Sequence, residues 1–285
     1  QYGDDDFSFA INGVSRFRVN TYRQRGSLAA VIRIIQFQLP DPATLGIPDS
    51  IIELGQLNKG LVLVTGPAGS GKSTTLACIV NAINSSCKKH IITLEDPLEY
   101  LHPHKQSIVS QREIHIDTGS YANALRASLR QSPDVILLGE MRDQETTTVA
   151  MTAAETGHLI FSTLHTIGAA NTIDRIIDVF PPNQQRQITV QLSMTLQAVI
   201  SQQLVPDTTG NLIPAFEIMT VTPAIRNMIR ENKIPQISGI LYGASSRDMI
   251  SMDSSLFNLY RSGRISKETA LTYASNPDML SKKLL

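Results

Sequence analysis

The sequence predicts an α/β fold built around a mainly parallel sheet, and two observations support this. From Leu57 onward, short apolar runs typical of buried strands alternate with longer stretches typical of helices. A glycine-rich turn joins the first of these runs to the helical stretch that follows it. We expect strands at 61–65, 90–94, 134–138 and 159–163, and helices at about 71–85, 120–130, 143–155, 168–178 and 184–200.

The first forty residues have a different pattern, in which apolar and polar residues alternate as they do in short antiparallel strands. These runs span 6–11, 14–22 and 28–35, with turns expected at Asn12-Gly13 and at Gly26. Three strands alone would leave one face of their sheet uncovered, so we expect the natural protein to have residues before Gln1.

A run of prolines and a glycine after position 39 marks a linker, and the chain becomes polar and helical after Gly210. Helices are expected there at about 222–231, 234–242, 253–262 and 266–274. The chain is therefore expected to contain the C-terminal part of a small N-terminal α+β domain (1–38), a linker (39–50), an α/β core (51–210) and a C-terminal strand and helical region (211–285).

The composition is that of a soluble globular protein with a zero net charge, since Lys plus Arg and Asp plus Glu number 25 each. The sequence has no basic stripe of the kind that nucleic-acid-binding proteins carry, which argues against such a partner. No apolar stretch approaches the roughly 18 residues needed to cross a bilayer, so no direct membrane insertion is expected. Cys78 and Cys87 are too far apart for a disulfide and are interpreted as packing residues in a reducing compartment.

Residues 66–73 follow the pattern G-x-x-x-x-G-K-S, which identifies a phosphate-binding P-loop between a strand and a helix. Glycines in such a loop allow backbone N–H groups to point at the phosphates, and the Lys72 ammonium reaches the β- and γ-phosphates. The Ser73 hydroxyl can ligate Mg²⁺, so ATP with Mg²⁺ is the expected ligand. The residues expected to hold the nucleotide are Gly66, Pro67, Ala68, Gly69, Ser70, Gly71, Lys72, Ser73 and Thr74.

Polar residues follow three further apolar runs, at the ends where a parallel sheet binds its ligands. Glu95, Asp96 and Glu99 follow the second expected strand, and Glu140 and His165 follow the third and fourth. All of them are expected to meet the P-loop in one crevice. His158 precedes the fourth strand, so it lies too far from His165 to share a metal ion with it.

With these segments in place, the chain resembles the secretion and type IV pilus ATPase superfamily. The resemblance rests on the Walker A motif, an acidic box at 95–100, an atypical Walker B motif at 138–143 and a histidine box at 157–165. It implies a RecA-like core preceded by the remainder of a PAS-like domain. It also implies that Glu140 binds Mg²⁺ through water, that Glu99 polarises the attacking water, and that His165 senses the γ-phosphate.

The same resemblance assigns two arginines of the small domain, Arg18 and Arg33, to the ATP of a neighbouring subunit. We expect them to lie two strands' width apart. Residues 224–231, AIRNMIRE, are similar to a motif of the pilus retraction ATPases. On a helix, Ile225, Met228 and Ile229 would share one face and Arg226 and Arg230 another, either as an ordinary packed helix or as a surface that transmits motion.

The resemblance implies a homohexameric motor for pilus retraction that acts on an inner-membrane platform protein from the cytoplasmic side. The two cysteines favour retraction, because assembly and secretion relatives typically carry a four-cysteine zinc insertion. Ala68, where the family commonly has Thr, and the segment 243–256 depart from the family pattern. The alternatives are a pilus-assembly or secretion ATPase, a DNA-translocating ATPase and a P-loop kinase for a small metabolite.

Overall fold

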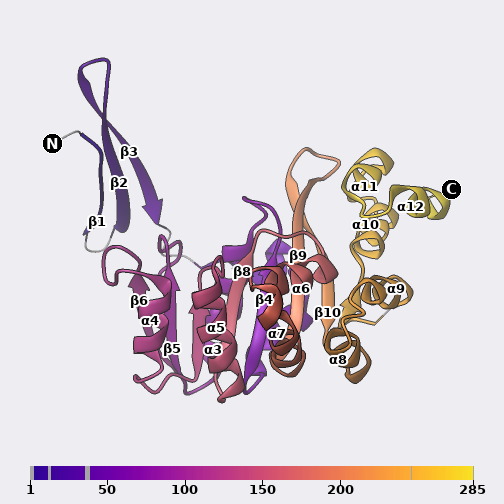
Figure 1. Cartoon of the computed structure of the whole chain (residues 1–285). Coiled ribbons are helices and arrows are strands. Elements are labelled where there is room, and N and C mark those ends of the chain that lie inside the picture. The colour runs from indigo at the N-terminus through magenta and orange to yellow at the C-terminus, as the bar shows by residue number, and fades with distance from the viewer. Residues whose placement is uncertain (1–2, 12–13, 36–38, 245, 285) are drawn as a thin grey trace.

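The computed structural model describes residues 3–11, 14–35, 39–244 and 246–284. Figure 1 shows three parts in a row: a small sheet, a central sheet flanked by helices, and a group of C-terminal helices. The predicted turn at Asn12-Gly13 lies outside the described residues. The predicted α/β fold with a mainly parallel sheet is confirmed.

The central sheet has eight strands in the order β11-β10-β9-β4-β8-β7-β5-β6. The six strands β4 to β9 run parallel to one another, whereas β10 is antiparallel to β9 and β11 is antiparallel to β10. All six residues of β4 are buried, which explains the continuous apolar run that precedes the P-loop. The strands are β4 (Gly60–Thr65), β5 (His90–Glu95), β6 (Ile108–Glu113), β7 (Val135–Leu138), β8 (Leu159–Leu164), β9 (Leu196–Pro206), β10 (Leu212–Thr220) and β11 (Met249–Ile250).

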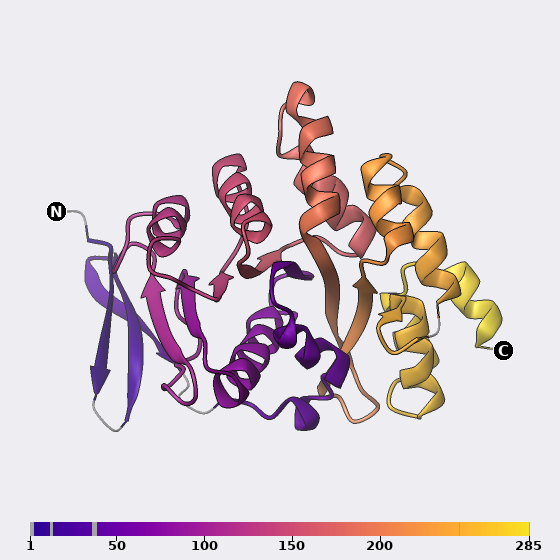
Figure 2. The ribbon, with the colours of Figure 1, turned by 90° about the horizontal axis from the view of Figure 1, so that it is seen from below.

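Helices cover both faces of this sheet, as Figure 2 shows from below. One face packs against α3 (Lys72–Ser86) and α2 (Asp49–Ile52), with Ile79 and Ile83 of α3 fully buried between the layers. The other face packs against α4 (Tyr121–Ser128), α5 (Gln144–Glu155), α6 (Ala169–Asp178) and α7 (Pro182–Thr195). This two-sided burial leaves the carboxyl ends of the parallel strands as the free edge for a ligand.

The helix predicted at 184–200 is wrong beyond Thr195, because residues 196–200 begin β9. β9 pairs with β4 on one side and with β10 on the other. Hydrogen bonds to these two strands satisfy the backbone N–H and C=O groups of residues 196–200. The apolar spacing of these residues continues that of α7, so the sequence pattern alone indicates a longer helix. The sequence prediction also missed β6 as a strand, the short helix α1 (Pro42–Leu45) together with α2 in the expected linker, the 3₁₀ turn η1 (Glu53–Gln56), and α12 (Pro277–Lys283).

The three N-terminal strands form the predicted antiparallel sheet, in the order β1 (Asp5–Ile11), β2 (Ser15–Gln24) and β3 (Ser27–Ile35). Its apolar face is largely exposed and includes a stacked pair of rings, Phe9 and Phe17, with centroids 5.1 Å apart. Its other face carries Arg16, Arg18 and Arg33. The expectation that Arg18 and Arg33 lie two strands' width apart is wrong, because they are direct cross-strand partners on β2 and β3.

The last part of the chain forms helices at the end of the sheet beyond β10 (Figure 1). They are α8 (Pro223–Arg230), α9 (Pro235–Gly243), α10 (Met252–Arg261), α11 (Lys267–Tyr273) and α12. A separate small core joins α10, α11 and α12 to the ends of β9 and β10, and Leu256 is its fully buried centre. Among the described helices, none is both long and apolar enough to cross a membrane.

The helix α8 contains most of the AIRNMIRE motif and has the predicted amphipathic character. Ile225 and Ile229 are fully buried, and Met228 packs against the same core. The two arginines differ, since Arg226 donates hydrogen bonds to the carbonyl oxygens of Ser193 and Met194 at the end of α7, whereas Arg230 is exposed. Arg226 therefore caps a neighbouring helix, and Arg230 is the more exposed of the two arginines.

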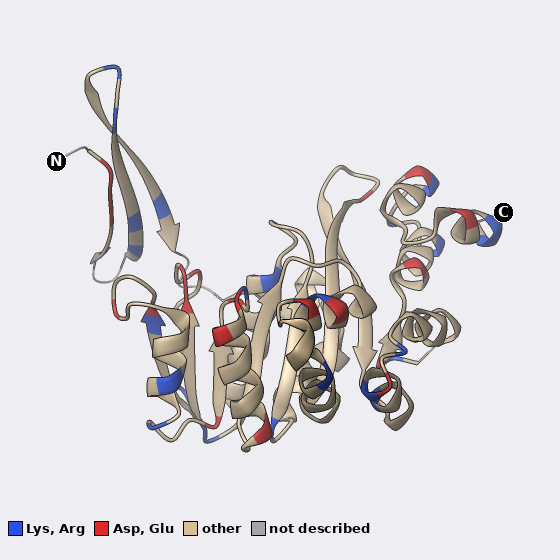
Figure 3. Ribbon diagram, viewed as in Figure 1, with Lys and Arg blue, Asp and Glu red and all other residues tan. Residues whose placement is uncertain are grey.

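Charged residues of both signs are interspersed along the described chain in the view of Figure 3. The basic segments of the small sheet include Arg16, whose guanidinium pairs with the buried carboxylate of Glu113 at 2.9 Å. Because Glu113 ends β6, this ion pair ties the arginine-bearing face of the small sheet to the edge of the central sheet. The sequence analysis did not single out either residue.

Candidate active site

A cavity of about 560 Å³ opens at the carboxyl ends of the parallel strands. It is lined by the P-loop after β4, the acidic segment after β5, the residues after β7 and the start of the loop after β8. The structure thus brings Lys72, Glu99, Glu140 and His165 to one place. The relevant strands β4, β8, β7 and β5 are neighbours in the sheet, which is why their ends meet.

The P-loop is held from behind by Gln202, a buried residue of β9. A Cβ atom at Gly66, where φ is +138°, would lie 2.1 Å from the Gln202 carbonyl oxygen, so only glycine fits there. The Gln202 side-chain oxygen also accepts a hydrogen bond of 2.7 Å from Thr75 of α3. Sequence reasoning missed Gln202, because the residues of β9 before it were assigned to a helix.

The Lys72 ammonium lies across the P-loop and donates hydrogen bonds of 2.9 Å to the carbonyl oxygens of Gly66 and Pro67. Burial lowers the pKa of this amine, and the negative charges of Glu99 and Glu140 oppose the shift. The Ser70 hydroxyl of the same loop is buried without a hydrogen-bond partner in the described part of the chain. A lysine and an unsatisfied hydroxyl inside a glycine-rich loop are the groups that a phosphate would engage.

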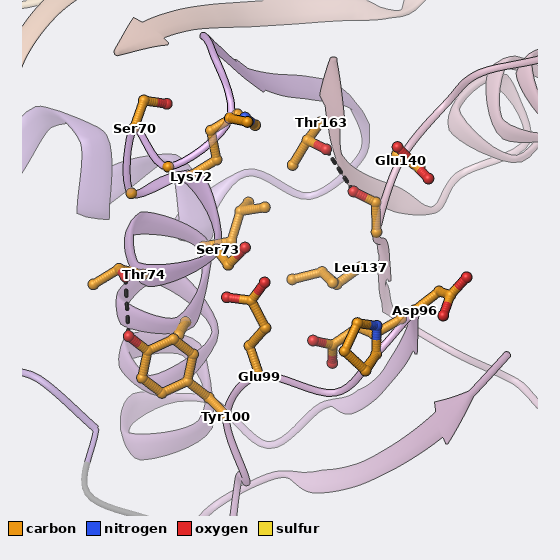
Figure 4. Close-up of a pocket in the computed structure, with 18 of the residues that line it drawn as sticks. Ser70, Lys72, Ser73, Thr74, Asp96, Glu99, Tyr100, Leu137, Glu140 and Thr163 are labelled. Carbon is orange, nitrogen blue, oxygen red and sulfur yellow. Dashed lines mark hydrogen bonds between the residues drawn. The ribbon is translucent and has the colours of Figure 1, made fainter. Parts of the chain in front are cut away.

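The acidic segment lies opposite the P-loop, as Figure 4 shows. The exposed Glu99 carboxylate points into the cavity toward Ser73 at the start of α3. Next to it, the Tyr100 hydroxyl is 2.9 Å from the Thr74 hydroxyl, within hydrogen-bond distance. This contact holds the segment against α3, while the Glu99 side chain stays exposed in the cavity.

Glu95 lies deeper in the cavity at the end of β5, and burial raises its pKa to about 7. The Gln111 side chain, whose Nε2 atom donates a hydrogen bond of 3.5 Å to Glu95 Oε1, favours the charged form and opposes the shift, whereas the Glu99 charge adds to it. The carboxyl group therefore changes its charge near neutral pH in the nucleotide-free protein.

The raised pKa of Glu95 should make the stability of the nucleotide-free protein fall as the pH rises from about 4.5 to about 7. Over that range the folded protein retains a proton that the unfolded chain has lost. The penalty, about 3 kcal/mol, is complete above that range. Replacing Glu95 with Gln should raise the Tm by roughly 5 °C or more at pH 8 and leave it nearly unchanged at pH 4.5, measured by circular dichroism. An equal change at both pH values would rule out this titration.

Glu140 follows β7 and connects the cavity to the end of β8. Its Oε2 atom pairs with the Arg142 guanidinium and lies 3.7 Å from Nε2 of the exposed His165. The Tyr121 hydroxyl packs against Gly139, where a Cβ atom would approach it to 2.7 Å. The imidazole of His165 therefore lies beside the Glu140 carboxylate at the cavity.

The oxygen atoms in the cavity suit Mg²⁺ bound together with a nucleotide. No group of three metal-ligating His, Cys, Asp or Glu side chains occurs among the described residues. Mg²⁺ in nucleotide sites needs only one or two protein ligands, because phosphates and waters supply the rest. Ser73 and Glu140 line the same cavity and provide a hydroxyl and a carboxylate, so the donor set fits the ion.

His158 lies before β8, at the opposite end of this strand from His165. Its Nδ1 atom is 3.1 Å from the Ala153 carbonyl oxygen.

Arg18 and Arg33 do not line this cavity in their own chain. Arg18 lies 3.7 Å from the Asp6 carboxylate within the small sheet, and Arg33 is exposed beside it. Both share the sheet face of Arg16, which contacts the central sheet. The structure therefore pairs the two predicted arginines with each other and keeps them apart from the P-loop.

Comparisons with known proteins agree with the geometry of the site. The sequence model of the type II/IV secretion system proteins matches residues 3–246. A twitching motility protein from Neisseria gonorrhoeae is 49% identical over 277 residues, which are 97% of this chain and 74% of that protein. The type IV pilus retraction ATPase PilT from Pseudomonas aeruginosa is 46% identical over 278 residues, covering 98% of this chain and 81% of that protein.

A solved structure of the pilus retraction motor PilT with bound ADP superposes on this chain with a TM-score of 0.93 and 49% identity. The match covers 99% of this chain and 80% of that one. The resemblance inferred from the four sequence motifs is therefore confirmed. This chain belongs to the type II/IV secretion system protein family.

Proposed function

We propose that this protein hydrolyses ATP as a hexameric motor and drives the retraction of type IV pili. The observation that carries the proposal is the 46–49% identity, over nearly the whole chain, to proteins named for twitching motility and pilus retraction. The P-loop cavity lies within the matched region. The aligned region extends beyond the P-loop cavity and, at 97–98% of this chain, includes the C-terminal helices, which an unrelated P-loop enzyme would not share.

In this proposal the residues of the cavity divide the work of hydrolysis. Lys72 exchanges its two carbonyl partners for the β- and γ-phosphates. Glu99 accepts a hydrogen bond from the attacking water and orients it. Ser73 and, through water, Glu140 would hold Mg²⁺, which would stabilise the phosphate charge. His165, beside Glu140, senses whether the γ-phosphate is present.

The motor is a homohexamer in which Arg18 and Arg33 of one subunit stabilise the phosphates bound to its neighbour. Their distance from the cavity of their own chain supports this arrangement. The ring acts on a pilus platform protein at the cytoplasmic face of the inner membrane, without entering the membrane. Arg230, exposed on α8, is the arginine of the AIRNMIRE motif available for such a contact.

Two of the alternatives are ATPases that would use the same cavity. A pilus-assembly or secretion ATPase would share the site, but the chain has only two cysteines and so lacks a four-cysteine zinc insertion. A DNA-translocating ATPase is disfavoured by the zero net charge and by the interspersed charges of Figure 3.

Purified protein tests the enzymatic part of this proposal. We expect Mg²⁺-dependent ATP hydrolysis, unchanged by added DNA, from a particle with the mass of six chains in light scattering. Stimulation by DNA would favour the translocase. A monomeric or dimeric protein that phosphorylates a small metabolite would contradict the motor and favour a kinase.

A further inference from the structure

Glu217 is a buried carboxylate on β10 to which the proposed chemistry assigns no role. It pairs across the sheet with Ser201 of β9, so the two side chains lie side by side on one face. The Ser201 hydroxyl accepts a hydrogen bond of 2.9 Å from the Gly168 N–H group. Ser201 and Glu217 together contact the end of the loop that carries His165, at Gly168 and Ala169.

The two oxygens of Glu217 bind the first residues of two different helices. One accepts a hydrogen bond of 2.8 Å from the Ala169 N–H group at the start of α6, and the other one of 3.3 Å from the Met252 N–H group at the start of α10. The first N–H groups of a helix have no partner inside it. Both helix dipoles favour a negative charge at this position, although burial raises the pKa of the carboxyl group.

The helix α6 is closely tied to the histidine box, because Ala169 follows His165 by only four residues. The intervening loop is held by the Thr166 and Thr172 hydroxyls, 2.7 Å apart, and by a hydrogen bond of 2.8 Å from Thr172 to the Gly168 carbonyl oxygen. A shift of His165 would therefore move the loop together with the start of α6. Such a shift would act directly on the Glu217 carboxylate.

The helix α10 leads away from the nucleotide cavity into the C-terminal helices. Met252 and Leu256 of α10 are buried in the small core that also contains α11 and α12. The α10 helix packs against β10, the strand that carries Glu217. One carboxylate thus joins the segment next to the γ-phosphate position to the helical region at the far end of the sheet.

We propose that Glu217 is a positioning residue that couples the His165 loop to the helices α10–α12. The inference rests on the proposed function, because it assumes that His165 moves when the γ-phosphate leaves. A carboxylate can hold two helix starts only while both stay within hydrogen-bond distance. A displacement of the His165 loop therefore changes the position favoured for α10, and the nucleotide state reaches the C-terminal helices.

The test uses the Glu217→Gln variant of the assembled protein, because Gln keeps the shape but has only one acceptor oxygen. In the wild type, amides at the start of α10 should exchange hydrogen at rates that differ by at least about fivefold between ADP and a non-hydrolysable ATP analogue. In Glu217→Gln this difference should disappear. The affinity for ADP should stay within about twofold, and kcat should fall by about 2- to 30-fold with little change in KM.

Ser201→Ala provides the matched variant, since it removes a contact to the His165 loop and leaves the Met252 contact in place. It should lower kcat but keep the nucleotide-dependent exchange of α10. A state-dependent difference that survives in Glu217→Gln would overturn the coupling, as would a wild type without any difference. ATP hydrolysis by the wild type is measured separately, so failure of the coupling is distinct from failure of the proposed function.

Discussion

The Glu99→Gln variant should bind ATP about as tightly as the wild type and hydrolyse it at least about 100-fold more slowly. Gln has the shape of Glu99 but cannot accept a proton from the attacking water. The side chain is exposed at the mouth of the cavity and packs against little, so the fold should be unaffected. Binding is measured with a fluorescent ATP analogue, and turnover by the release of inorganic phosphate.

Glu268→Gln is a suitable control, because Glu268 is exposed on α11 and outside the cavity. It should change neither binding nor turnover. Near-normal hydrolysis by Glu99→Gln would assign the catalytic carboxylate elsewhere, with Glu95 and Asp96 as the next residues to replace because they line the same cavity.

Replacing Arg33 with Ala should slow ATP turnover by roughly 10³-fold while the ring and the fold persist. The expected cause is the loss of a positive charge that stabilises the transition state in the neighbouring subunit. Arg33 is exposed and contributes little to its own sheet. Turnover and particle mass are measured on the same preparation, so loss of the ring is separable from loss of catalysis.

Mixed rings show whether the arginine acts between subunits. Arg33→Ala and Glu99→Gln subunits, each inactive alone, should recover activity when mixed, because some interfaces then join an intact Arg33 to an intact Glu99. Arg23→Ala is the control: Arg23 is exposed on the same small sheet but on its opposite face. No recovery at any mixing ratio would place the action of Arg33 within its own chain.

The position of the nucleotide site could be predicted from the sequence because its residues immediately follow strands. In a parallel sheet the carboxyl ends of neighbouring strands meet, so Glu99, Glu140 and His165 could be assigned to one crevice. The pattern at residues 66–73 predicted the P-loop, which forms another part of the cavity lining. This reasoning needs only the approximate ends of these four strands, so the helix wrongly expected over the start of β9 did not affect it.

The start of β9 could not be predicted because nothing in the local sequence separates it from α7. Thr195 and Leu196 are consecutive, without a glycine or proline between helix and strand, and the apolar spacing continues across the junction. The strand forms because β4 and β10 offer hydrogen bonds on both sides. Such long-range pairing lies outside any local pattern.

The pairing of Arg18 with Arg33 could have been found by counting residues. A tight turn near Gly26 places Gln24 opposite Ser27, and moving outward along both strands brings Arg18 opposite Arg33. Glu217 had no comparable signal. It lies in an apolar run, and its importance comes from two helix starts that only the folded chain brings together.

Retraction of single labelled pili in living cells tests the central claim most directly. The gene for this protein would replace the retraction ATPase gene of a piliated bacterium, and pilus length would be followed by fluorescence microscopy. Our account predicts that pili extend and then shorten, and that cells with the Glu99→Gln variant carry pili that stay extended. Cells that form pili only when this protein is present, or pili that never shorten although the purified protein hydrolyses ATP, would contradict the account.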